Sequence, residues 1–280
     1  MDRGWQNGGM SKLSHFLVAS ACFWGTAAMA AAGSLPGLYI EDMTSPELQA
    51  RLRAGSTTVL IPIGGTEQSG PHLALGKHNA RARVLAGQIA ERLGHAVVAP
   101  VIAYVPEGSI DPPVAHMRFT GTISIPEATF ESMLESTARS FKQHGFRQVV
   151  FLGDHGGYQK SEERVAAKLN KAWAKDPACR VLALSAYYRV TQTDYVADLK
   201  KRGFSEAEIG MHAGLADTAL TMALAPEMVR TELLGQAGKQ GAHNGVSGDP
   251  RRATADLGQM GVQRIVESSV AAIRAAQTAP

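Results

Sequence analysis

The chain has 280 residues, 45% of them hydrophobic, which is enough for one sizeable core and favours a single folded domain. Its 28 basic and 25 acidic residues nearly balance and leave a formal net charge of +3. Because phosphate binding needs a concentrated basic face, this balance argues against nucleic acid as a partner.

The N-terminal segment has the pattern of a secretory signal peptide. Lys12 precedes an apolar run, residues 16–30, that ends in Ala-Met-Ala. The run is too short and too rich in small residues for a membrane span, and it lacks the polar alternation of a buried first helix. We expect cleavage after Ala30, with Met10 as a second possible start. The mature protein is then periplasmic or secreted, has no membrane attachment, and keeps Cys179 without a disulfide partner.

Strand-like and helix-like segments alternate along the mature chain. Strands that alternate with helices of this length predict an α/β protein, with a mainly parallel sheet between helices in one domain, residues 31–280. In such sheets, ligands bind at the carboxyl ends of the strands. The predicted strands are residues 57–63, 97–104, 149–152 and 181–187, and the predicted helices are residues 79–93, 126–144, 158–175, 206–224 and 256–275.

Polar clusters stand where several of these elements begin or end. Glu67 and His78 lie in the loop after the first strand, His155 follows the third, and His212 stands near Asp217 in a later segment. Each His alone would more often be a structural residue. Together, two His and one carboxylate from separate strand ends are suitable ligands for a catalytic metal, and they leave room for water or substrate. A bound divalent ion lowers the pKa of water towards neutrality, which suits hydrolysis.

Five segments resemble motifs of the creatininase family of metal-dependent amidohydrolases, and they follow the family's order. The resemblance spans about residues 57–260 and implies a creatininase-like three-layer domain. It also implies a homo-oligomer, with a hexamer as the family analogy. The segments are IPIGGTEQSGPHLALGKHN (residues 61–79), RFTGTISIP (118–126), GFRQVVFLGDHGG (145–157), HAGLADTALTMALAPEMV (212–229) and GVSGDPRRAT (245–254).

The resemblance implies the metal ligands residue by residue. Glu67 matches the motif's Glu ligand, and His155 matches its strand-end His. His78 stands where the family has a bridging Asp, while Ser69 and Gly157 replace a His and a Glu that act as ligands in creatininase. An imidazole does not readily bridge two ions. The set Glu67, His78 and His155 therefore implies one divalent ion, zinc first, with manganese or iron as alternatives.

The resemblance also implies the catalytic groups. His212 matches a family His that shuttles a proton near the substrate, a role that suits a pKa near neutrality. Asp217 replaces a Glu and is expected to orient a ligand or accept a proton. His116 stands where relatives often carry a His near the pocket, and it is the third candidate. We expect His72 and Asp154 to orient the ligands.

These observations predict an exported, metal-dependent amidohydrolase that cleaves a small non-peptide C–N bond, such as a cyclic amide. The changed ligand set argues against creatinine itself as the substrate. Two alternatives stay open. The same ligands could serve a single-metal isomerase or lyase, or the chain could be a non-catalytic binding protein on the same scaffold.

Overall fold

Four strands form one parallel sheet in the part of the chain that the structure describes. The computed structural model describes residues 37–278, so the expected signal peptide, residues 1–30, lies outside the described residues. The strand order is β2-β1-β3-β4, and all neighbouring pairs are parallel. The strands are β1 Thr58–Ile63, β2 Ala96–Val98, β3 Gln148–Gly153 and β4 Arg180–Ala183.

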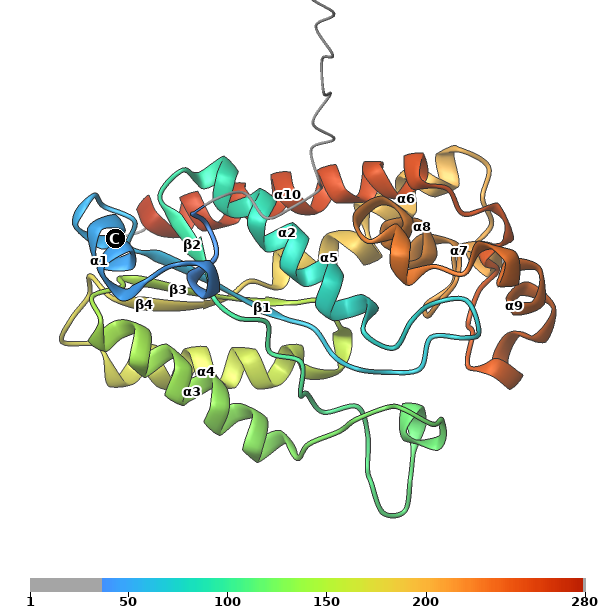
Figure 1. Ribbon diagram of the computed structural model, residues 1–280, viewed down its shortest axis with the longest axis horizontal. Coiled ribbons are helices and arrows are strands. Elements are labelled where there is room, and N and C mark those ends of the chain that lie inside the picture. Colours follow the sequence, from blue (N-terminus) through green and yellow to red (C-terminus); the bar gives the residue numbers. More distant parts are fainter. Residues whose placement is uncertain (1–36, 279–280) are drawn as a thin grey trace, which may run out of the picture. The chain divides into compact units, whose positions relative to one another are not determined.

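Helices cover both faces of this sheet. They are α1 Ser45–Arg53, α2 Lys77–Leu93, α3 Glu127–Gln143, α4 Gln159–Ala172, α5 Ser185–Gln192, α6 Asp194–Lys201, α7 Glu206–Ile209, α8 Leu215–Leu224, α9 Leu234–Gln240 and α10 Ala255–Thr278. Successive strand residues point to opposite faces. In β1, Leu60 packs in one core with α2, α5, α8 and α10, whereas Val59 and Ile61 pack in another with α3 and α4. Figure 1 shows these two helix layers on either side of the sheet. The predicted three-layer α/β fold is confirmed.

Two predicted elements end earlier than the apolar pattern indicates. β2 is three residues long, and the chain after it continues as a loop with a single bridge between Ile63 and Ile102. β4 ends at Ala183, and Tyr187 lies in α5 instead of in the strand. Tyr187 is buried in the core beside α10. In the sequence, a buried apolar residue in a short helix cannot be told from one at the end of a buried strand.

The predicted helix over residues 206–224 is broken in the middle. α7 ends at Ile209, the following Gly210 has φ 68° and Ala213 has φ 53°, so His212 lies in a turn between α7 and α8. The backbone N–H of His212 donates to the carbonyl of Ser247 at 3.1 Å. This hydrogen bond takes the place of the one that the N–H of His212 would make in a continuous helix. His212 therefore lies in a turn and not on the surface of a helix.

The order of the strands places three loops at one edge of the sheet. Ile63 pairs with Gly153 at the carboxyl ends of β1 and β3, so the loops after these strands leave side by side. β2 lies on the other side of β1, and the loop after it returns to the same edge. This is the switch point at which open α/β sheets bind ligands. Among residues 37–278, no helix is long and apolar enough to cross a membrane.

Candidate metal centre and active site

The loop after β1 is fixed against the start of α2. The N–H of Gly65 donates to Oδ1 of Asn79 at 3.0 Å, and the Tyr158 hydroxyl donates to the carbonyl of Gly64 at 2.7 Å. A Cβ on Gly64 would lie 2.8 Å from the Cα of Asn79, so the close approach requires glycine there. The loop then carries Glu67 to a position where it is fully buried.

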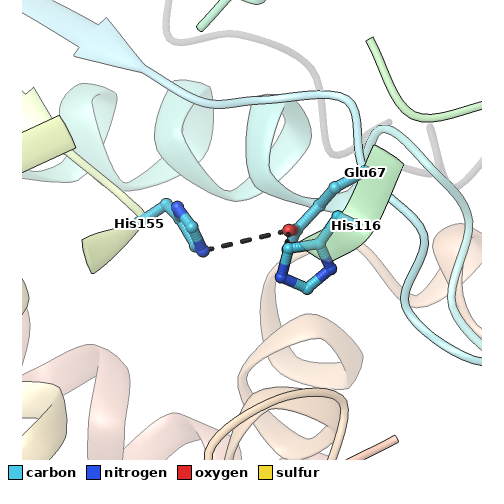
Figure 2. Close-up of side chains that lie close together, drawn as sticks. All are labelled: Glu67, His116 and His155. Atoms are coloured by element: carbon cyan, nitrogen blue, oxygen red, sulfur yellow. Dashed lines mark ion pairs between the residues drawn. The ribbon is translucent and has the colours of Figure 1, made fainter. Parts of the chain in front are cut away.

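Four histidines surround the carboxylate of Glu67. Oε1 lies 2.8 Å from Nε2 of His78 and 3.6 Å from Nδ1 of His212. Oε2 lies 3.4 Å from Nε2 of His116 and 3.8 Å from Nε2 of His155. Figure 2 shows the last two rings and Glu67 converging from separate parts of the chain. Ligand atoms of Glu67, His116 and His155 lie within 4.8 Å of one another, so these three could hold a metal ion.

Asp154 fixes the orientation of His78. Its Oδ2 lies 2.6 Å from Nδ1 of His78 and 2.7 Å from a guanidinium nitrogen of Arg81. Burial favours the neutral acid, but the charge of Arg81 and the bond to His78 lower the pKa of Asp154 below its usual value. On its other side, Nε2 of His78 forms a hydrogen bond with Oε1 of Glu67 at 2.8 Å, and Nε2 would offer its lone pair to an ion that displaces the proton of that bond. Metal-binding histidines are held in this way.

Gln68 gives His116 a different hydrogen-bonding state. The side-chain Oε1 of Gln68 accepts from the N–H of Gly70 at 3.1 Å, and its Nε2 donates to the carbonyl of Gly245 at 3.2 Å. These bonds fix the amide, whose Nε2 lies 3.1 Å from Nδ1 of His116. Nδ1 therefore accepts, and a neutral His116 carries its proton on Nε2, facing Glu67. In this state, Nε2 of His116 faces Oε2 of Glu67 at 3.4 Å without a hydrogen bond to it, and Nε2 could bind an ion only in the other tautomer.

His212 is held with the opposite nitrogen protonated. Its Nε2 lies 2.9 Å from the backbone carbonyl of Gln68 and donates to it. The lone pair of Nδ1 is then left 3.6 Å from Oε1 of Glu67. Burial, and next the charge of Lys77, lower the pKa of His212 to about 4. The ring is therefore neutral near pH 7, but it is a weaker base than the expected pKa near neutrality would make it.

Buried charges hold the turn that carries His212. Asp217 pairs with both Lys77 and Arg81, and it accepts from the N–H of Ala213 at 2.8 Å. Although burial opposes ionisation, the two cations keep the pKa of Asp217 well below its usual value. These contacts give Asp217 an orienting position. The expected role of Asp217 as a proton acceptor stays a prediction.

Glu107, which comes from the loop after β2, lies at the site although no sequence motif indicates it. Its side chain is buried, and its Oε2 lies 3.7 Å from Nδ1 of His155. Neither carboxyl oxygen has a hydrogen-bond partner among the described residues. Burial and the charge of Glu67 raise the pKa of Glu107 to about 9. In the sequence, the signal is weak: an acidic residue between Pro106 and Gly108, in a loop that follows a strand.

A cavity of about 60 Å³ adjoins the cluster. Its lining includes His78, His155 and His212 together with Leu220 and Ile265. A cavity lined by both polar and apolar side chains suits a small-molecule ligand.

The sequence matches the creatininase family model, described as creatinine amidohydrolase, over residues 41–273. It is 31% identical over 213 residues to the mycofactocin precursor peptide peptidase of Mycolicibacterium smegmatis, which covers 72% of this chain and 78% of the relative. It is 27% identical over 198 residues to the creatinine amidohydrolase of Pseudomonas putida, at 69% and 74% coverage. A crystal structure of creatinine amidohydrolase (creatininase) aligns with TM-score 0.69 and 21% identity, covering 88% of this chain and all of that one.

The residues at the site fit a metal ion. Oε2 of Glu67 is buried and has no hydrogen-bond partner within residues 37–278, and imidazole and carboxylate are donors that zinc and manganese accept. Solved creatininases include a Zn–Zn type and a manganese form. The family match and these donors lead to one conclusion: the chain belongs to the creatininase family and is a metal-dependent amidohydrolase.

Proposed function

We propose that this chain hydrolyses a small non-peptide C–N bond, as in a cyclic amide, with one divalent ion held by Glu67, His78 and His155. The observation that carries the proposal is the state of His78. Its Nδ1–H donates a hydrogen bond to Asp154, and the Nε2 of His78 lies 2.8 Å from Oε1 of Glu67. Zinc is the proposed ion, with manganese or iron compatible with the same donors. When bound, it would polarise a carbonyl group and lower the pKa of a water molecule.

The chain's own groups would bind the substrate and move protons. Nδ1 of His212 accepts a proton from the attacking water and returns it to the leaving nitrogen. His116 directs Nε2–H towards the cluster and can donate a hydrogen bond to a substrate oxygen. Leu220 and Ile265, which line the cavity, favour a compact substrate with an apolar side.

The test compares metal-free and zinc-loaded protein on a panel of amides, lactams and lactones. Zinc-dependent turnover of an amide is the expected result, and His144→Ala, an exposed His outside the cluster, should match the wild type. In water labelled with heavy oxygen, hydrolysis places solvent oxygen in the product. Turnover without that label would identify an isomerase or lyase, and ligand binding without turnover would identify a binding protein.

A short peptide is the second candidate substrate. The relative from Mycolicibacterium smegmatis, at 31% identity, is named a precursor peptide peptidase. Short peptides therefore belong in the same panel. Preferential cleavage of a peptide bond over every lactam and amide would replace the non-peptide proposal.

We also propose export and self-association. The charged, apolar and Ala-Met-Ala segments before residue 31 support a signal peptide, so protein from the native host should begin near Ala31. N-terminal sequencing tests this, and soluble cytoplasmic protein that keeps residues 10–30 would contradict it. Family analogy supports a homo-oligomer, with a hexamer as the expected size. Light scattering of the purified protein measures that size directly.

A further inference from the structure

Lys77 is a fully buried lysine beside the histidine cluster. It is the first residue of α2, and its side chain is 0% exposed. Its Nζ pairs with Asp217 and lies 3.7 Å from Oε1 of Glu67. A cation at the first residue of a helix meets the positive end of the helix dipole, and burial of an ammonium group costs free energy. Neither the helix nor the core favours a lysine here, so its two carboxylate partners must compensate for both costs.

The two carboxylates differ in what else compensates them. Asp217 also pairs with Arg81 and accepts from the N–H of Ala213 at 2.8 Å. Within residues 37–278, the other ion-pair neighbours of Glu67 are the four histidines that surround it, so Lys77 is its one lysine or arginine partner there. Lys77 is therefore not required to pair Asp217, and its position is explained best by Glu67.

The ammonium group of Lys77 lies among groups that would suit a metal ion. It pairs with the carboxylates of Glu67 and Asp217, and Nδ1 of His212 lies 3.6 Å from the same oxygen of Glu67. Carboxylate oxygens and a neutral imidazole are donors that zinc accepts. We propose that Lys77 is a fixed cation of the site, which occupies this position and so limits the centre to one divalent ion. The inference rests on the proposed function, because it presupposes the first ion.

The charge of Lys77 gives this limit its physical basis. A second divalent ion beside the ammonium group would bring like charges together where little water screens them. It would also have to separate the ammonium from Asp217 and Glu67, which would leave a buried charge without its partners. Lys77 itself supplies one positive charge and no coordination position. The protein therefore compensates these carboxylates without a second ion.

The test counts zinc equivalents by calorimetric titration of the metal-free, full-length protein. The wild type and Lys77→Arg, which keeps the charge, should bind about one equivalent, whereas Lys77→Met, which removes the charge, should bind about two. Asp217 keeps Arg81 and the N–H of Ala213 in that variant, so the turn that carries His212 retains its other contacts. Lys77→Gln also removes the charge but keeps an N–H donor for Asp217. It decides the question if the methionine variant does not fold.

Lys168→Met is the matched control. Lys168 is 65% exposed and pairs with Glu135, so this variant loses one positive charge outside the cluster. It should bind about one equivalent, as the wild type does. The double variant Lys77→Met with Asp217→Asn removes a carboxylate donor from the second position. It should return to about one equivalent, which would locate the second ion beside Asp217.

The outcomes separate this inference from the proposed function. Wild-type protein that binds no zinc would refute both. One equivalent in the wild type and in both neutral Lys77 variants would overturn the role of Lys77 alone. Loss of all zinc from the neutral variants would make Lys77 a support of the first ion, and it would equally overturn that role. So would a second equivalent in the wild type, in Lys77→Arg or in Lys168→Met, because the charge of Lys77 would then not limit the centre.

Discussion

The rings of His116 and His212 lie against each other, with centroids 4.5 Å apart, and Gln68 contacts a nitrogen of each. Gln68 sets both states. Its side-chain amide donates to Nδ1 of His116, and its backbone carbonyl accepts from Nε2 of His212. One ring therefore presents an N–H to Glu67, and the other presents a lone pair. Two adjacent histidines can thus serve as a donor and a base at the same pH.

The first prediction tests whether His78 or His116 is the third metal ligand. His78→Ala should release the ion, because its Nε2 lone pair is the proposed donor, whereas His116→Ala should retain it. Elemental analysis after dialysis measures both. Loss from His116→Ala with retention in His78→Ala would instead favour the group of Glu67, His116 and His155 that lies within 4.8 Å.

The second prediction separates binding from proton transfer. His155→Ala should lose the ion and all activity. His212→Ala should keep the ion and lose turnover by about a hundred- to ten-thousand-fold, the usual contribution of a general acid–base group. Metal content and kcat of each variant are the measurements. The reverse pattern, with the ion lost only from His212→Ala, would exchange the two roles.

The third prediction concerns stoichiometry. Ser69 and Gly157 offer no strong ligand, and the imidazole of His78 does not readily bridge, so about one tightly bound ion per chain is expected. A zinc titration with a calorimetric readout counts the sites. Two equivalents of similar affinity would show that the chain keeps a two-ion centre like that of the Zn–Zn creatininase.

The fourth prediction is a pH dependence outside the metal centre. Burial, and next the charge of Glu163, raise the pKa of Glu162 well above its usual value. The folded protein therefore keeps a proton that the unfolded chain releases above about pH 4.3. The contribution of this proton to the free energy of unfolding is fully present below about pH 4.3, and it is lost as the pH rises towards the raised pKa of Glu162 in the folded protein. Glu162→Gln should exceed the wild type in stability by a margin that grows from about pH 5 to about pH 8. Urea unfolding midpoints of both proteins at about pH 5 and about pH 8 test this prediction. An equal difference between the two proteins at both pH values would contradict it.

The sequence was sufficient for the sheet but not for the ends of several elements. β1 and β3 are six-residue runs that are buried throughout, and such runs of apolar residues are the clearest sign of a central parallel strand. Tyr187 shows the limit, because an apolar residue in a short helix against the sheet looks like the end of a strand. The break before α8 depends on a distant segment, since the backbone of His212 pairs with Ser247.

The site shows the same division between local and distant information. That Glu67 and His155 approach each other follows from adjacent parallel strands, and a sequence pattern can indicate this. The protonation states of His116 and His212 cannot be predicted that way, because they depend on the contacts that Gln68 makes with both rings. Glu107 was missed because its importance lies in its burial beside His155, and burial in a loop leaves no periodic pattern.

The loop between β2 and α3 contains a buried part and an exposed part. Glu107 is buried at one end and His116 lies at the other, whereas residues 108–115 between them are exposed. Figure 1 shows this segment extending away from the sheet. Its tip can therefore change in length or composition without disturbing either core. The chain therefore has a segment that can diverge, or be engineered, while the groups around the proposed metal site remain unchanged.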